Sequence, residues 1–94
     1  APSLTAVYDP EENRCLMAGT MQPPPEGKAF QIWFAQGNQK ASPGLLRSDS
    51  EGRVLMFLEL LPGLTGIDSV LISLEPAGGS SQPTTMAVAL GRAG

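Results

Sequence analysis

Hydrophobic and polar residues alternate with a period of two along most of this chain, and no window shows the 3.6-residue period of an amphipathic helix. Short alternating segments are separated by clusters of Gly, Pro, Asn, Asp and Ser, which is typical of strands joined by turns. The predicted strands are residues 3–8, 14–19, 29–36, 44–48, 53–60, 67–75 and 85–90. The pattern therefore predicts an all-β fold.

Turn and breaker residues indicate how these strands connect. Residues 9–13 separate the first two segments and are compatible with a hairpin between them. Residues 49–52 have the form of a type I turn ending at a left-handed glycine, which predicts a second hairpin between 44–48 and 53–60. The proline run at 23–25 removes three backbone donors, so it predicts a connection that crosses from one sheet to another.

The number of strands favours two packed sheets over one. Turns recur at about 8- to 12-residue spacing, and a single sheet of this size would leave one apolar face in water. We therefore expect a small antiparallel β-sandwich, immunoglobulin-like in size, formed by one domain over residues 1–94. The strand at 29–36 has bulky side chains on both faces, as expected of a central strand. Its two faces carry Phe30, Ile32 and Phe34 and, opposite them, Gln31, Trp33 and Ala35.

Composition and charge exclude several classes of function. The net charge is −3 and the six basic residues are scattered, so no row of cations is present to neutralise phosphates and no nucleic-acid partner is expected. The absence of His removes the usual general base and any Ser-His or Cys-His nucleophile pair. Among the nine carboxylates, only Glu59, Asp68 and Glu75 lie in or beside predicted strands. We expect neither an enzyme nor a bound cofactor.

The sulfur-containing residues have two interpretations. Cys15 with Met17, Met21 and Met86 suggests a soft-ligand site for monovalent copper. Core packing is the favoured interpretation, because Cys is commonly buried and Met fills irregular gaps. We therefore expect no metal site, and the lone cysteine excludes an intrachain disulfide.

No segment is predicted to cross a membrane. The longest apolar run, residues 54–61, is interrupted by Glu59 and is shorter than the roughly 20 residues of a spanning helix. The chain begins at Ala1 without an initiator Met or a signal-peptide pattern. We interpret it as a fragment of a longer protein.

Two side chains on predicted strands have alternative roles. Trp33 is either a core anchor, which is favoured, or a contact residue on the outer face beside Gln31. Glu75 is either a solvated strand end or, as we prefer, an acceptor of hydrogen bonds from the Gly78 and Gly79 amides that ties the following loop back. The two glycines are not interpreted as a phosphate cradle, because no helix follows them.

These features together resemble the C-terminal domain of RskA-type anti-sigma-K factors. The resemblance is carried by residues 30–34 (FQIWF), the turn at 49–52, and residues 73–80 (SLEPAGGS) followed by Gln82 and Pro83. It extends from about Leu4 to Gly91. The signature residues, with a structural or partner-binding role, are Gln31, Trp33, Glu75, Pro76, Gly78 and Gly79.

The resemblance implies a function outside catalysis. Such a parent protein would be a bacterial single-pass membrane protein, anchored by a helix outside this chain, with the present domain on the extracytoplasmic (periplasmic) side. A cytoplasmic domain, also outside this chain, would hold an extracytoplasmic-function sigma factor. Site proteases would release that factor by regulated proteolysis. The alternative is a secreted or cell-surface β-sandwich that serves as a binding or adhesion module, because fold alone does not fix function.

Overall fold

The computed structural model describes residues 3–92, with side chains described up to residue 88, and every regular element in this range is a β-strand. The all-β prediction is confirmed. Within this range there is no helix with the length and apolar character needed to span a bilayer. The strands are β1 (Ser3–Asp9), β2 (Arg14–Thr20), β3 (Lys28–Gln36), β4 (Gln39–Leu45), β5 (Arg53–Glu59), β6 (Ser69–Pro76) and β7 (Ala87–Arg92).

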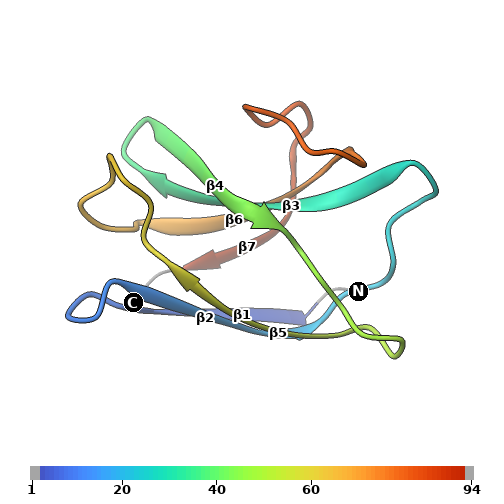
Figure 1. Cartoon of the computed structure of the whole chain (residues 1–94), viewed down its shortest axis with the longest axis horizontal. Coiled ribbons are helices and arrows are strands. Elements are labelled where there is room, and N and C mark those ends of the chain that lie inside the picture. Colours follow the sequence, from blue (N-terminus) through green and yellow to red (C-terminus); the bar gives the residue numbers. More distant parts are fainter. Residues whose placement is uncertain (1–2, 93–94) are drawn as a thin grey trace.

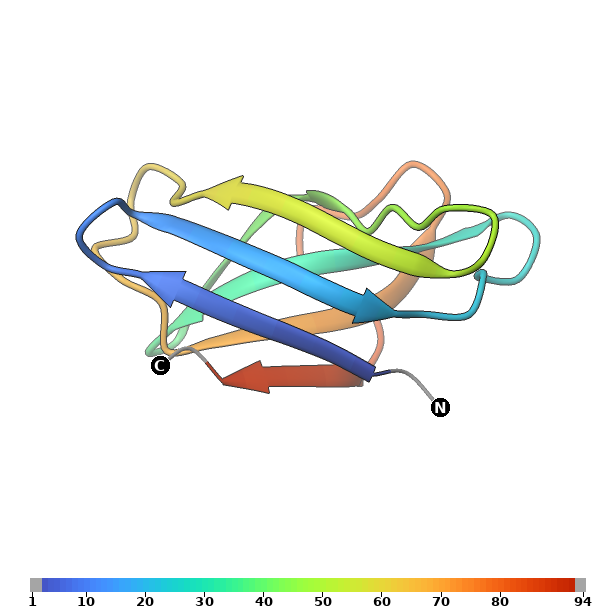
Figure 2. The same ribbon diagram turned by 90° about the horizontal axis from the view of Figure 1, so that it is seen from below.

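The strands form two antiparallel sheets that face each other (Figure 1). One sheet has the order β1-β2-β5, and the other has the order β4-β3-β6-β7. The predicted sandwich is thus confirmed, with β3 and β6 at the centre of the larger sheet. At one rim β7 of the larger sheet runs beside β1 of the smaller one (Figure 2).

The core lies between the two sheets and follows directly from the alternation in sequence. Residues that point inward from β2, β3, β5 and β6 are buried or partly buried, while their neighbours point outward. The buried cluster consists of Cys15, Met17, Met21, Phe30, Ile32, Phe34, Val54, Leu58, Ile67, Val70 and Ile72. Burial of each large apolar side chain contributes about 1.5–3 kcal/mol, so this cluster is the main source of stability.

The fourth strand overlaps the predicted residues only at 44 and 45. We predicted 44–48, but β4 is Gln39–Leu45 and follows a tight turn in which Gly37 has a φ of 57°. Pro43 lies inside β4. It is tolerated because β4 is an edge strand, where a missing donor costs no ladder bond on the open side. The pairing of β3 with β4 also shifts register between Ile32 and Phe34.

The hairpin predicted around residues 49–52 is wrong, although the turn itself is present. Gly52 has a φ of 81°, and its N–H donates to the Asp49 carbonyl at 3.0 Å. However, β5 pairs with β2 and β4 pairs with β3, so this turn lies on a connection between the two sheets. The predicted hairpin of the first two strands and the predicted crossing at 23–25, between β2 and β3, are both confirmed.

The last predicted strand also needs correction. It begins at Ala87 and not at residue 85, so Met86 lies in the preceding loop, where 88% of its surface is exposed. The expectation that Met86 packs in the core is therefore wrong. After the connection from β5, β6 begins at Ser69, two residues later than predicted.

Candidate functional site

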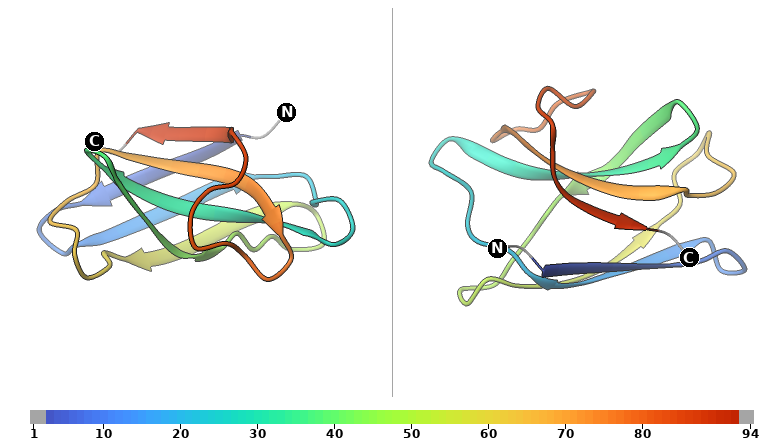
Figure 3. Two further views of the ribbon diagram at one scale, coloured as in Figure 1. Left: turned by 90° about the horizontal axis from the view of Figure 1, so that it is seen from above. Right: turned by 180° about the vertical axis from the view of Figure 1, so that it is seen from behind.

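The loop at 77–86, between β6 and β7, covers part of the outer face of the four-stranded sheet. Figure 1 shows this loop on the side of the sheet that faces away from β1, β2 and β5. The left panel of Figure 3 shows it from above, crossing the strands below it. The signature residues gather where this loop meets β3 and β6, so this is the candidate site.

A chain of buried hydrogen bonds links the two central strands. Trp33 of β3 donates from Nε1 to Ser73 Oγ of β6 at 2.9 Å, and Ser73 Oγ donates to Glu75 Oε2 at 2.6 Å. Trp33 is only 1% exposed, yet it lies outside the core cluster between the sheets. Trp33 is thus buried, but on the outer face next to Gln31 and not in the core between the sheets, where its favoured interpretation placed it. A contact role for it stays a prediction.

The Glu75 carboxylate is the centre of this network. It is 1% exposed and accepts further hydrogen bonds from Ser80 Oγ at 2.8 Å, from the Thr84 N–H at 3.0 Å and from Thr84 Oγ1. Glu75 therefore ties the loop back, as we preferred, but the loop donors are Ser80 and Thr84 and not the predicted Gly78 and Gly79 amides. The Gly79 N–H donates instead to the Pro76 carbonyl at 2.8 Å, closing a turn.

The hydrogen bonds that Glu75 accepts keep its carboxylate ionised. Bonds from Ser73 and Thr84 lower its pKa from 4.5 to about 2, against the opposing effect of burial. None of the ion pairs within residues 3–92 involves Glu75, so hydroxyl and amide dipoles stabilise the charge. Such a carboxylate is ionised at neutral pH and its lone pairs are occupied, which suits a structural anchor and not a general acid.

Gln31 holds the same loop at a second point. Its Nε2 donates to the Ser80 carbonyl at 3.0 Å, and the Ser80 N–H donates to its Oε1 at 2.8 Å. Gly79 has a φ of 84°, and a Cβ there would lie 3.4 Å from Gln31 Oε1. Gly78, by contrast, has open space around it and no such conformation, so its geometry does not require glycine.

Open hollows flank the anchored loop on two sides. One has a volume of about 370 Å³ and is bounded by the Trp33 ring and β6, with Lys40 at its edge. Its lining residues are Trp33, Lys40, Leu71, Ser73, Gln82, Pro83, Thr85 and Ala87. The other has a volume of about 550 Å³ and lies between Gln31, the end of β4 and the glycines of the loop. The network therefore shapes the walls of both hollows.

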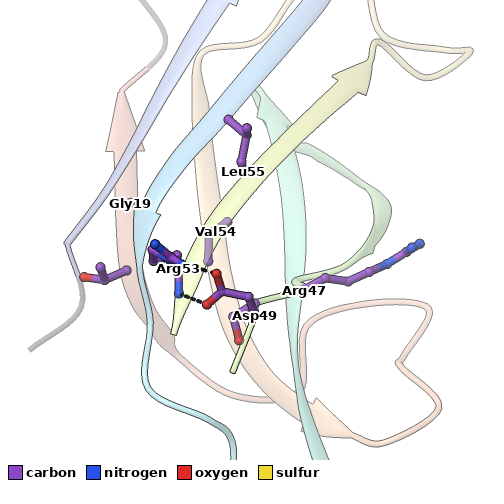
Figure 4. Close-up of a pocket in the computed structure, with 8 residues that line it drawn as sticks. Gly19, Arg47, Asp49, Arg53, Val54 and Leu55 are labelled. Atoms are coloured by element: carbon purple, nitrogen blue, oxygen red, sulfur yellow. Dashed lines mark hydrogen bonds and ion pairs between the residues drawn. The ribbon is translucent and has the colours of Figure 1, made fainter. Parts of the chain in front are cut away.

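A third hollow, of about 790 Å³, lies away from this loop, at the start of β5 (Figure 4). There Asp49 accepts hydrogen bonds from Arg53 Nε at 2.8 Å and from the N–H groups of Glu51 and Arg53, each at 2.9 Å. Bonds from the Arg53 backbone and side chain and from the Glu51 backbone lower the pKa of Asp49. Asp49 and Arg53 are thus bonded to each other, and their contacts stabilise the turn at 49–52.

Comparison with known proteins places the chain in a family. The family model described as "Anti-sigma-K factor rskA, C-terminal" matches residues 1–88. This chain belongs to the RskA C-terminal family. The family is one of regulatory proteins. The resemblance based on residues 30–34 and 73–83 is thereby confirmed.

The chain is similar to two curated relatives, and the name of one of them supports the assignment to the RskA C-terminal family. The chain is 30% identical over 82 residues to "Anti-sigma-K factor RskA" of Mycolicibacterium vanbaalenii, covering 86% of this chain and 34% of the relative. It is 36% identical over 87 residues to "Uncharacterized protein in phr 5'region" of Streptomyces griseus, covering 92% and 35% respectively. The chain thus spans about a third of the length of these relatives. No solved structure matches it.

For this RskA-type domain, sequence reasoning missed the hydroxyl partners of Glu75. Ser73 was open to detection, because it lies two residues before Glu75 and so shares its face of the strand. Ser80 and Thr84 reach the carboxylate only because the loop folds back over the sheet. The hydrophobic pattern of the sequence does not predict the course of a loop. Pro76, at the exposed end of β6, contributes its carbonyl to the turn at Gly79. A partner-binding role for the signature residues stays a prediction.

The residues considered for copper do not form a site in the described structure. Cys15, Met17 and Met21 are buried in the core, whereas Met86 is exposed in the loop. Burial raises the pKa of the Cys15 thiol, which disfavours the thiolate that a metal would need. Within residues 3–92, no group of three or more His, Cys, Asp or Glu residues is arranged to hold a metal ion.

Proposed function

We propose that residues 1–94 form one β-sandwich domain on the extracytoplasmic side of a membrane-anchored anti-sigma factor. The parent protein would hold an extracytoplasmic-function sigma factor through a cytoplasmic domain, and regulated proteolysis by site proteases would release it. The observation that carries this proposal is the family match over residues 1–88. The relative named anti-sigma-K factor supports the class of partner.

In this proposal the loop at 77–86 is the part of the domain that responds to a signal. The loop lines part of two open hollows. It is held by a small number of hydrogen bonds centred on Glu75 and Gln31. A ligand or partner that binds one arrangement of the loop more tightly than another shifts the population between them. That shift would change access of a protease to the parent protein.

The proposal is tested in the parent protein with a sigma-dependent transcriptional reporter. Deletion of the domain is compared with Glu75→Gln, which keeps the shape of the side chain but removes its charge. Glu26→Gln is the matched control, because Glu26 is an exposed carboxyl in the connection between β2 and β3. An immunoblot of the parent protein follows its cleavage in parallel.

We expect both the deletion and Glu75→Gln to change reporter output and the amount of cleaved parent protein, and Glu26→Gln to leave both as in the wild type. Reporter output that stays unchanged by the deletion under every stress tried would refute a sensing role. A change with the deletion but none with Glu75→Gln would keep the domain as a regulator and reject the anchored loop as its responsive part.

A further inference from the structure

The outer edge of β5 is open and apolar. β5 is the last strand of the three-stranded sheet, as Figure 2 shows. Leu55 is 66% exposed and Phe57 is 75% exposed, although both belong to a regular strand. A free strand edge presents unpaired backbone N–H and C=O groups, and exposed apolar side chains on the same strand favour its pairing with another strand.

The pairing of β5 with β2 shows which backbone groups of β5 have no partner in that ladder. The Leu60 N–H donates to the Asn13 carbonyl, and the Met21 N–H donates to the Gly52 carbonyl. Because hydrogen-bonded pairs alternate along an antiparallel ladder, the even-numbered residues of β5 bond to β2. The N–H and C=O groups of Leu55, Phe57 and Glu59 therefore point to the open edge. Within residues 3–92 no hydrogen bond outside the β2–β5 ladder engages them.

The open stretch has a defined start and end. At Arg53, the Asp49 N–H donates to the backbone carbonyl at 2.9 Å, and Asp49 Oδ1 accepts from the backbone N–H at 2.9 Å. Asp49 thus occupies the position that a partner strand would take opposite Arg53. The strand ends at Glu59, so the available edge runs from Leu55 to Glu59 and is centred on Phe57.

The other strand edges are protected in ways that β5 is not. β4 carries Pro43, and its ladder with β3 is interrupted by a register shift. β1 and β7 run beside each other at the closed rim of the sandwich. Between Leu55 and Glu59 there is no proline, glycine, lysine or bulge.

We propose that β5 pairs antiparallel with β5 of a second copy of this chain, about a twofold axis at Phe57. Phe57 then lies opposite its own copy, and Leu55 lies opposite Glu59 of the other copy in both halves. All three free residues form ladder bonds in this register, and none requires the blocked position at Arg53. The two sheets join into one six-stranded sheet with an isologous interface.

The side chains of this register are complementary. The Phe57 side chains form a cross-strand aromatic pair, the kind of pair that stabilises antiparallel ladders. Glu59 of one copy lies on the diagonal from Arg53 of the other, within reach of that long side chain, and the two carry opposite charges. The Arg53 side chain is 67% exposed despite its bonds to Asp49 and Glu51. Charge complementarity of the edge with itself therefore favours a second copy over an unrelated strand.

Sedimentation velocity of the 94-residue chain over a range of concentrations tests the proposal. We expect a monomer–dimer equilibrium that Phe57→Lys weakens at least about tenfold, because two like charges then lie directly opposite each other. Leu55→Lys should not weaken association, since each lysine lies opposite Glu59 of the partner copy. Val7→Lys, on the same outer face but on β1, should change association less than about twofold, because it lies away from the edge.

A cross-link gives an independent readout of the register. Directly opposite residues in a hydrogen-bonded pair have Cα atoms about 5.5 Å apart, within the range of a disulfide. Phe57→Cys should therefore form covalent dimers under mild oxidation, whereas Val7→Cys and the wild type, with buried Cys15, should not. A monomer at every concentration, weakening by Val7→Lys equal to that by Phe57→Lys, or weakening by Leu55→Lys would each overturn the proposal.

Discussion

Gln31 and Ser80 exchange two hydrogen bonds across 49 residues of sequence, with Ser80 donating its N–H at 2.8 Å and accepting at its carbonyl at 3.0 Å. The amide side chain of Gln31 thus bonds to the Ser80 backbone in the way that a residue of a neighbouring strand would. Together with Glu75 it fixes the loop at 77–86 to the outer face of the sheet. Loop anchoring therefore accounts for the contacts of Gln31, Glu75 and Gly79, whereas the geometry at Gly78 does not require glycine.

Replacing Gln31 with Ala should loosen the loop before it unfolds the domain. The change removes two hydrogen bonds and leaves the Ser80 backbone partly unsatisfied, so we expect a loss of about 1 to 3 kcal/mol in the free energy of unfolding. Hydrogen exchange should increase at residues 78–84 more than in β3 and β6. Gln22→Ala, at an exposed position, is the control. Equal increases throughout the sheet would contradict a local role.

The pH dependence of stability should report the charge of Glu75. Its pKa falls from 4.5 in an ordinary environment to about 2 in the folded state, so ionised Glu75 favours folding. This contribution is complete above pH 4.5 and is lost as the pH falls toward 2. Asp49 acts in the same direction, because its bonds to Arg53 also lower its pKa.

Urea unfolding between pH 6 and pH 2.5 measures this effect in an Asp49→Asn background, which removes the second contribution. We expect Glu75→Gln to reduce stability at neutral pH and to flatten the decline on acidification. An equally steep decline in the Glu75→Gln variant would show that other groups determine acid stability.

Much of the fold followed from sequence periodicity, and the exceptions have physical causes. The alternation along β3 correctly grouped Phe30, Ile32 and Phe34 on one face, which is the face in the core, because β3 lies between two neighbouring strands and its ladder with β6 is regular. β4 was missed because Pro43 is compatible with a strand only at an edge, and edge position is a property of the whole sheet. The loop donors to Glu75 were missed because the side chains of a loop, unlike those of a strand, do not alternate in a regular pattern that shows where they point.

The two glycines of the loop should tolerate substitution very differently. Gly79→Ala places a Cβ in a left-handed conformation and close to Gln31, so we expect a loss of about 1 to 2 kcal/mol in stability. Gly78→Ala meets open space in an ordinary conformation and should be nearly neutral. Thermal unfolding of the two variants makes the comparison. Equal losses would show that the loop backbone differs from the one described.

Cys15 should report global unfolding. The thiol is buried in the core and burial raises its pKa, so the native state offers little reactive thiolate. We expect labelling by a thiol reagent to be slow in buffer and to accelerate with denaturant in parallel with loss of the fold. Rapid labelling under native conditions would show that the two sheets separate locally around β2.

The most direct test of the anchored loop is hydrogen exchange of the Trp33 indole N–H, observed by NMR. In the structure this proton is donated to Ser73, whose hydroxyl is held in turn by Glu75. We predict exchange in the wild type as slow as that of β3 backbone amides, and much faster exchange in Ser73→Ala. An indole proton that exchanges in the wild type as fast as a solvent-exposed one would contradict the buried network and the anchoring of the loop with it.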